Sequence, residues 1–134
     1  MPQPPEPDNS FAEIISSYSR AEAIDDGVLV DITAAASALR FRDPTAITHS
    51  AWVNHIATPA IAARFGETDA GRLGDMLNAL RMAISAGALG ADRVHFVFLA
   101  TDHRGHRSGR RLWAKAGPGD TGERVLTIMQ EGED

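Results

Sequence analysis

One short segment concentrates the side chains best suited to bind a charged ligand. Residues 102–109 read Asp-His-Arg-Gly-His-Arg-Ser-Gly, and two further arginines follow directly. A guanidinium forms paired hydrogen bonds with a carboxylate or phosphate more readily than a lysine ammonium does. The segment therefore predicts contact with a phosphate or an acidic protein surface, with an ordinary solvated hairpin tip as the alternative. The basic side chains predicted to contact a partner are His103, Arg104, His106, Arg107, Arg110 and Arg111.

A metal site in this segment is disfavoured. His103 and His106 lie three residues apart in a loop with Asp102, and they lack the further fixed ligands that a metal ion requires. The chain contains no cysteine, which excludes disulfides and cysteine-based zinc sites. We therefore expect no metal and no cofactor.

A second charged cluster, of opposite sign, surrounds Gly27. Asp25 and Asp26 precede this glycine and Asp31 follows it, but the spacing does not match a calcium-binding loop. The simplest interpretation is that Asp25 and Asp26 form a turn. Because the N-terminal part of the chain is strongly acidic, we also predict that these two carboxylates contact a basic groove of a partner.

The sequence carries no signature of a familiar catalytic or nucleic-acid-binding class. It has no nucleophile elbow, no phosphate-cradling glycine loop and no dinucleotide fingerprint. The net charge is −5 and aromatic residues make up 6% of the chain, so direct nucleic-acid binding is not expected. No apolar run is long enough to span a bilayer, and the proline-rich start has no basic flank or apolar core of a signal peptide. We expect a cytoplasmic protein.

The elements that would position these clusters begin with a capped helix. Ser19 and Glu22 have the spacing of a capping box, Gly27 can end the short helix, and residues 28–32 favour a strand. A second short helix is predicted over residues 33–41, with Asp31 or Thr33 as its cap. Before them, residues 1–10 are predicted to be a disordered, proline-rich arm, and residues 14–15 are compatible with a short strand.

The middle of the chain predicts helices and the last third predicts strands. Thr48 is expected to cap a helix, and the longest helix is expected over residues 69–86 with a buried stripe. Strands are predicted over residues 94–100, 111–116 and 124–129, the first of them buried on both faces. The fold class that follows is α+β: one domain over residues 11–134, with a βα unit and helices packed on a mostly antiparallel sheet that ends in a three-stranded meander. The stripe residues are Leu73, Met76, Leu77, Leu80 and Ile84.

Three blocks of the chain resemble a known family. They are residues 18–31, residues 41–52 with Pro44, Thr48 and Trp52, and residues 115–129. In these blocks the chain is similar to a family of uncharacterised small proteins carried by phages, plasmids and other bacterial mobile elements. The resemblance implies an accessory gene, and such genes often encode antagonists of host defence, including anti-CRISPR proteins.

A fainter resemblance implies an enzyme. The order of strand, short helix, Asp-Gly and strand also opens many ADP-ribosyltransferase folds, and would put Tyr18 and Arg20 near a nicotinamide pocket. The downstream tyrosine and catalytic glutamate of that fold have no recognisable counterpart. Our leading hypothesis is a non-enzymatic protein that uses its charged surface to bind and inhibit a host defence protein. In this hypothesis the defence protein is part of a nucleic-acid-binding complex. The alternative is an ADP-ribosyltransferase-like enzyme or an NAD-binding protein, and self-association into a homodimer is left open.

Overall fold

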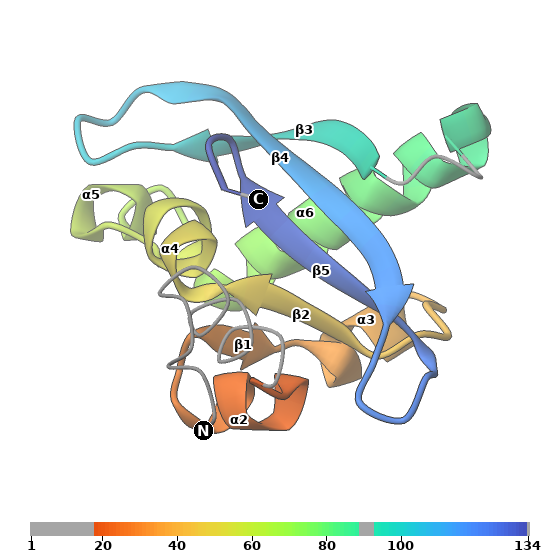
Figure 1. The fold of residues 1–134 in the computed structure, drawn as a ribbon. Helices are drawn as coiled ribbons and strands as arrows, with labels where there is room; N and C mark the ends of the chain where they lie inside the picture. The colour runs from red at the N-terminus through yellow and green to blue at the C-terminus, as the bar shows by residue number, and fades with distance from the viewer. Residues whose placement is uncertain (1–17, 89–92, 134) are drawn as a thin grey trace, which may run out of the picture.

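The computed structural model describes residues 18–88 and 93–133, which form a helix-covered five-stranded sheet (Figure 1). The predicted arm at 1–10 and the predicted strand at 14–15 lie outside the described residues. In chain order the elements are α2 (Arg20–Asp25), β1 (Leu29–Asp31), α3 (Thr33–Ala38), β2 (Thr45–Thr48), α4 (His49–Ala51), the π-helix η1 (Trp52–Ile56), α5 (Ala60–Ala63), α6 (Asp69–Ala83), the π-helix η2 (Ile84–Ala88), β3 (Arg93–Thr101), β4 (Arg107–Pro118) and β5 (Arg124–Gln130).

The sheet has the strand order β1-β2-β5-β4-β3 and is mostly antiparallel. The predicted meander of β3, β4 and β5 is confirmed. The sequence analysis missed β2, which pairs in parallel with β5, Thr45 opposite Leu126. β2 also pairs with β1, so it joins the N-terminal strand to the meander. The predicted α+β class is therefore confirmed.

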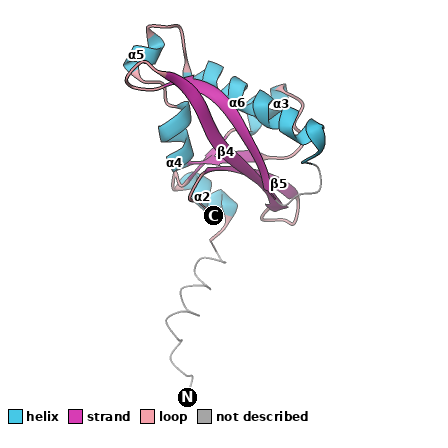
Figure 2. Cartoon of the chain, turned by 90° about the horizontal axis from the view of Figure 1, so that it is seen from above, coloured by secondary structure: helices cyan, strands magenta, loops and turns pink. Residues whose placement is uncertain are grey.

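Helix α6 covers one face of the sheet and forms the core with it. Its Met76, Leu77 and Leu80 are fully buried, as the predicted stripe requires, and they pack with Phe96 and Phe98 of β3. Helix α3 lies on the same side of the strands, whereas α2 lies on the other (Figure 2). Burial of each large apolar side chain contributes roughly 1.5–3 kcal/mol, so this layer is a major source of stability.

The opposite face of the sheet is only partly covered. The prediction that residues 94–100 are buried on both faces is wrong, because the Val97 and Leu99 side chains are 53% and 52% exposed. Side chains alternate along a strand, so Phe96 and Phe98 point to α6 while Val97 and Leu99 point away from it. β3 is one of the two edge strands, and Figure 1 shows α2 at the opposite end of the sheet, so α2 does not cover it.

The local signals that begin and end helices predicted most of the observed boundaries. The capping box is confirmed, because the Glu22 amide donates to the Ser19 hydroxyl at 3.0 Å, and Gly27 has a positive φ of 78°. Thr48 caps α4 as predicted. The helix predicted over residues 33–41 is shorter, since α3 ends at Ala38.

Neither Asp31 nor Thr33, the two residues predicted to cap α3, occupies its N-cap position. The residue at the N-cap position is Ile32, which makes no capping hydrogen bond. Asp31 instead accepts hydrogen bonds from the amide and the hydroxyl of Thr33, at 3.0 and 2.6 Å. These bonds lower the pKa of Asp31 and hold the turn between β1 and α3.

Candidate functional site

Internal hydrogen bonds hold the tip of the hairpin between β3 and β4. The Asp102 carboxylate accepts hydrogen bonds from the amides of Arg104 and His106, at 2.8 and 2.9 Å. The Asp102 amide donates to the His106 carbonyl at 2.8 Å, and Gly105 has a φ of 85° that favours glycine. The hydrogen bonds from the His106 and Arg104 amides lower the pKa of Asp102, which is therefore ionised at neutral pH. Asp102 thus shapes the turn.

Helix α5 supports this tip from below. A methyl group placed on Gly105 would lie 3.3 Å from Cδ1 of Ile61 in α5, so the turn backbone rests against that side chain. In Figure 1 the hairpin reaches across α5 at the edge of the molecule. The tip is held both by its own hydrogen bonds and by a neighbouring element.

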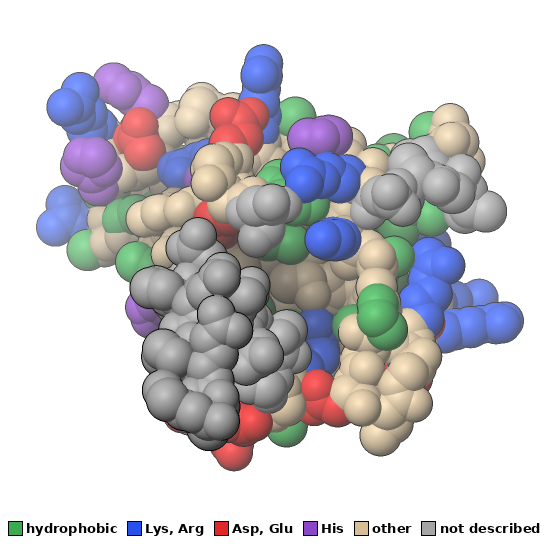
Figure 3. Space-filling view, in the orientation of Figure 1, with side chains coloured by type: hydrophobic (Ala, Val, Ile, Leu, Met, Phe, Trp, Pro, Cys, Tyr) green, Lys and Arg blue, Asp and Glu red, His purple; other side chains and the backbone are tan. Residues whose placement is uncertain are grey.

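The basic side chains of the tip point into solvent. His103, Arg104, His106 and Arg107 are all exposed, and Figure 3 shows arginine and histidine side chains gathered at this end of the molecule. The only ion pair among them in the described part of the chain is a long one, 3.9 Å from Arg107 Nη1 to a Glu67 carboxylate oxygen. The structure therefore brings four of the predicted contact residues together on one fixed turn.

Arg110 and Arg111 point to opposite faces of the sheet. Arg111 is exposed and lies beside Val97 on the open face. Arg110 turns inward, donates to the Asn54 carbonyl at 3.1 Å and lies 3.5 Å from Nδ1 of His55. Burial and the Arg110 charge lower the pKa of His55. Arg110 therefore anchors η1 to the hairpin and is less available to a partner than Arg111.

The sequence analysis missed the residue that holds the base of the hairpin. Arg72 of α6 is buried, with 3% of its side chain exposed. It donates to Glu67 Oε1 at 3.1 Å, to the His55 carbonyl at 3.0 Å, and to the Thr101 carbonyl at the end of β3. Glu67 in turn accepts the Thr101 amide at 3.2 Å. Burial by itself raises the pKa of Glu67, but the hydrogen bonds from Thr101 and Arg72 outweigh it, so the net effect is a lowered pKa.

A polar cleft of about 510 Å³ lies between this base, η1 and the hairpin. Its polar lining residues are Asn54, Arg72, Asp102, His103, Ser108 and Arg110. The donors of Arg72 point at protein carbonyls and Glu67, so the cleft offers a ligand fewer free cationic groups than its composition suggests.

The acidic turn does not join the hairpin. Asp25 and Asp26 are exposed at the end of α2, which precedes β1 at the sheet edge opposite β3. Asp26 accepts a hydrogen bond from the Tyr18 hydroxyl at 2.6 Å, and this bond raises the pKa of Tyr18 to about 12. The two predicted contact clusters are thus separate surfaces of the molecule.

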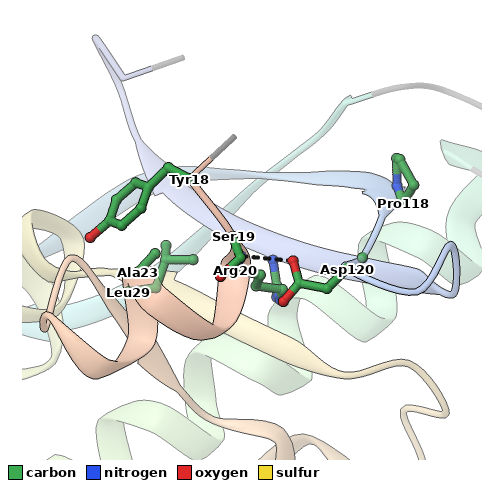
Figure 4. Close-up of a pocket in the computed structure, with 8 residues that line it drawn as sticks. Tyr18, Ser19, Arg20, Ala23, Leu29, Pro118 and Asp120 are labelled. Atoms are coloured by element: carbon green, nitrogen blue, oxygen red, sulfur yellow. Dashed lines mark hydrogen bonds between the residues drawn. The ribbon is translucent and has the colours of Figure 1, made fainter. Parts of the chain in front are cut away.

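Tyr18 and Arg20 do line a cavity, of about 600 Å³, together with Pro118 and Asp120 (Figure 4). The Arg20 guanidinium donates to the Thr127 hydroxyl at 2.8 Å and to a main-chain carbonyl of β5 at 2.7 Å. The Asp120 carboxylate accepts the Arg20 amide at 2.8 Å, and Figure 4 shows it directed at the start of α2. These groups fasten α2 to the sheet.

The described residues contain neither a metal site nor a membrane-spanning helix. No group of three or more histidine, aspartate or glutamate side chains there could hold a metal ion. Within the same ranges no helix has the length and apolarity needed to cross a membrane.

Comparison with known sequences places the chain in a family. A model described as a family of unknown function matches residues 8–134. The chain belongs to this family, DUF6573. Comparisons of the DUF6573 protein with curated proteins and with solved structures find no match.

Proposed function

We propose that this DUF6573 protein is a non-enzymatic binding protein whose β3–β4 hairpin contacts an acidic surface of a partner protein. One observation carries the proposal: four exposed basic side chains sit on a turn held by Asp102 and by Ile61 of α5. A fixed turn loses little conformational entropy on binding, so its charges favour association more than those of a mobile loop.

The partner surface is expected to be rich in carboxylates. Each exposed guanidinium can donate paired hydrogen bonds to a carboxylate, and the cationic turn speeds encounter with an anionic surface. A protein partner is favoured over a nucleic acid because the chain carries a net charge of −5 and the tip, residues 102–107, contains no Phe, Tyr or Trp on which a base could stack. The exposed carboxylates of Asp25 and Asp26 would make a second, separate contact with a basic groove.

The resemblance to mobile-element proteins supports a role against the host. In this proposal a phage or plasmid supplies the protein, which acts in the cytoplasm of the bacterial host. It inhibits a defence protein by occupying its surface, in the manner of an anti-CRISPR protein. No bond is made or broken, and no cofactor is needed.

The test is capture of a partner from bacterial lysate, with and without nuclease, followed by mass spectrometry. The variant Arg104→Glu/Arg107→Glu reverses two charges of the tip. The matched control, Arg42→Glu/Arg81→Glu, makes the same change in net charge at exposed sites away from the hairpin. We expect the tip variant to lose about tenfold or more in affinity for the captured protein, equal to about 1.4 kcal/mol. Equal binding of both variants at low salt would contradict the proposal.

One observation favours the second candidate, an ADP-ribosyltransferase-like enzyme: Tyr18 and Arg20 share a cavity. Incubation with labelled NAD and lysate separates the two. Label transfer that is lost in Tyr18→Ala would support the enzyme and contradict a purely binding role. The contacts of Arg20 with β5 lead us to expect no transfer.

A further inference from the structure

Strand β3 offers a long sheet edge with apolar side chains exposed near its centre. It spans nine residues at the end of the strand order, whereas β1 at the other edge spans three. Natural proteins protect sheet edges by keeping them short, charged or covered. On β3 the side chains of Val97 and Leu99 are instead about half exposed.

The main-chain groups of this edge are oriented for pairing. In an antiparallel ladder alternate residues point both main-chain groups at the neighbouring strand, and the residues between them point both groups away. The Asp102 amide bonds to His106 across the hairpin, whereas the amide and carbonyl of Thr101 bond to Glu67 and Arg72 outside the ladder. Counting back by twos, His95, Val97 and Leu99 also point their groups outward.

At its Thr101 end this edge is blocked by other hydrogen bonds, whereas the main-chain groups at its centre are available for pairing. Glu67 and Arg72 occupy the groups of Thr101, so a further strand cannot pair there. Across the described residues, no hydrogen bond joins the main chain of His95, Val97 or Leu99 to a segment other than β4. The open stretch is therefore residues 95–99.

We propose that a second copy of this chain occupies the open stretch, so that two β3 strands pair antiparallel about a two-fold axis at Val97. The sequence of the stretch, His-Phe-Val-Phe-Leu, is nearly symmetric about that residue. Val97 meets Val97, His95 meets Leu99, and Phe96 meets Phe98. Inward and outward side chains stay in register, no two like charges lie directly opposite, and about six main-chain hydrogen bonds form.

This symmetry favours a second copy over an unrelated peptide. A two-fold interface requires a surface that is complementary to itself, and the stretch satisfies this residue by residue. Continuing the sheet also continues the layer of Phe96 and Phe98 from one subunit to the next. Since the strands run in opposite directions, the two cationic hairpin tips lie at opposite ends of the joined strands. The dimer leaves both tips accessible.

The test introduces a charged residue at position 97, on the proposed two-fold axis. Val97→Lys sets two ammonium groups opposite each other, and Val97→Glu sets two carboxylates opposite each other. We expect the wild-type chain, measured by sedimentation equilibrium, to approach twice its mass of 14.3 kDa as concentration rises. Each variant alone is expected to stay monomeric, and an equimolar mixture of the two to form heterodimers. Circular dichroism checks that both variants fold, which is expected because Val97 is half exposed.

Two controls distinguish pairing at β3 from nonspecific association. Val53→Lys replaces a valine of η1 that is 49% exposed, and it should leave the dimer intact. Because the chain has no cysteine, Val97→Cys introduces a single thiol that should cross-link to its symmetry mate under mild oxidation, whereas Val53→Cys should not. A monomeric wild-type chain at every concentration, or dissociation by Val53→Lys to the same extent as by Val97→Lys, overturns the proposal.

Discussion

Replacing Arg72 with methionine tests how the hairpin is held. Methionine keeps an unbranched apolar stem but removes the guanidinium, which bonds Glu67, the His55 carbonyl and the Thr101 carbonyl. Two of these acceptors belong to the end of η1 and the end of β3. We therefore expect both a loss of global stability and a loosening of the hairpin base.

The magnitude follows from burial. Arg72 is 3% exposed and Glu67 is 16% exposed, so the carboxylate left behind is largely shielded from water. Removing one partner of a buried pair costs about 3–5 kcal/mol. The separate costs of the unsatisfied carbonyls overlap with this figure. For a chain of this length, 1 kcal/mol corresponds to roughly 4 °C in Tm, so we expect a fall of about 12–20 °C.

The assay is urea unfolding followed by circular dichroism, with amide hydrogen exchange as a local readout. Arg81→Met is the matched control, because Arg81 is an exposed arginine of the same helix, and it should change stability by less than about 0.5 kcal/mol. Glu67→Gln and the double variant complete a cycle that should show coupling of about 1–3 kcal/mol. A loss below about 1 kcal/mol for Arg72→Met, with unchanged exchange at residues 101–107, would refute the assigned role of Arg72.

Two further perturbations probe the tip and the base separately. Gly105→Ala should destabilise the protein in thermal unfolding by more than Gly27→Ala does. Both residues have a positive φ, but of the two only Gly105 lies close to a neighbouring side chain, that of Ile61. Equal effects of the two substitutions would mean that the tip does not rest on α5. Burial and the Arg110 charge lower the pKa of His55, so the unfolded chain binds a proton at this residue more tightly than the folded chain does. The protein should therefore lose stability as the pH falls below about 6.5, the ordinary pKa of histidine. The stability is fully present above that pH, and urea unfolding at pH 7 and 5.5 should show a smaller drop for His55→Gln than for the wild-type chain; an identical drop would assign the effect to other groups.

Local signals predicted much of the fold. The capping box at Ser19, the cap at Thr48 and the stripe of α6 depend on residues within one or two turns, so spacing alone identifies them. β2 escaped detection because it has four residues and runs directly into a helix. Its pairing with β5 is parallel and joins distant parts of the chain, so no short-range pattern reports it.

The candidate site was predictable only in part. The basic turn was evident from composition, but the inward turn of Arg110 depends on its place in the register, opposite Phe98. The exposure of Val97 depends on β3 being an edge, which the order of strands along the chain does not reveal. For Arg72 a signal did exist: it falls four residues before Met76 and eight before Leu80, so a charged residue occupied the buried stripe.

The central position of β5 in the sheet affects how the chain folds during its synthesis. It is the last described strand in sequence, yet β2 flanks it on one side and β4 on the other. Until a ribosome has delivered residues 124–130, the β1–β2 and β3–β4 pairs have no strand to join them. The native sheet therefore cannot close before these residues are synthesised, and until then the apolar surface of both strand pairs lacks its native partner, which favours aggregation.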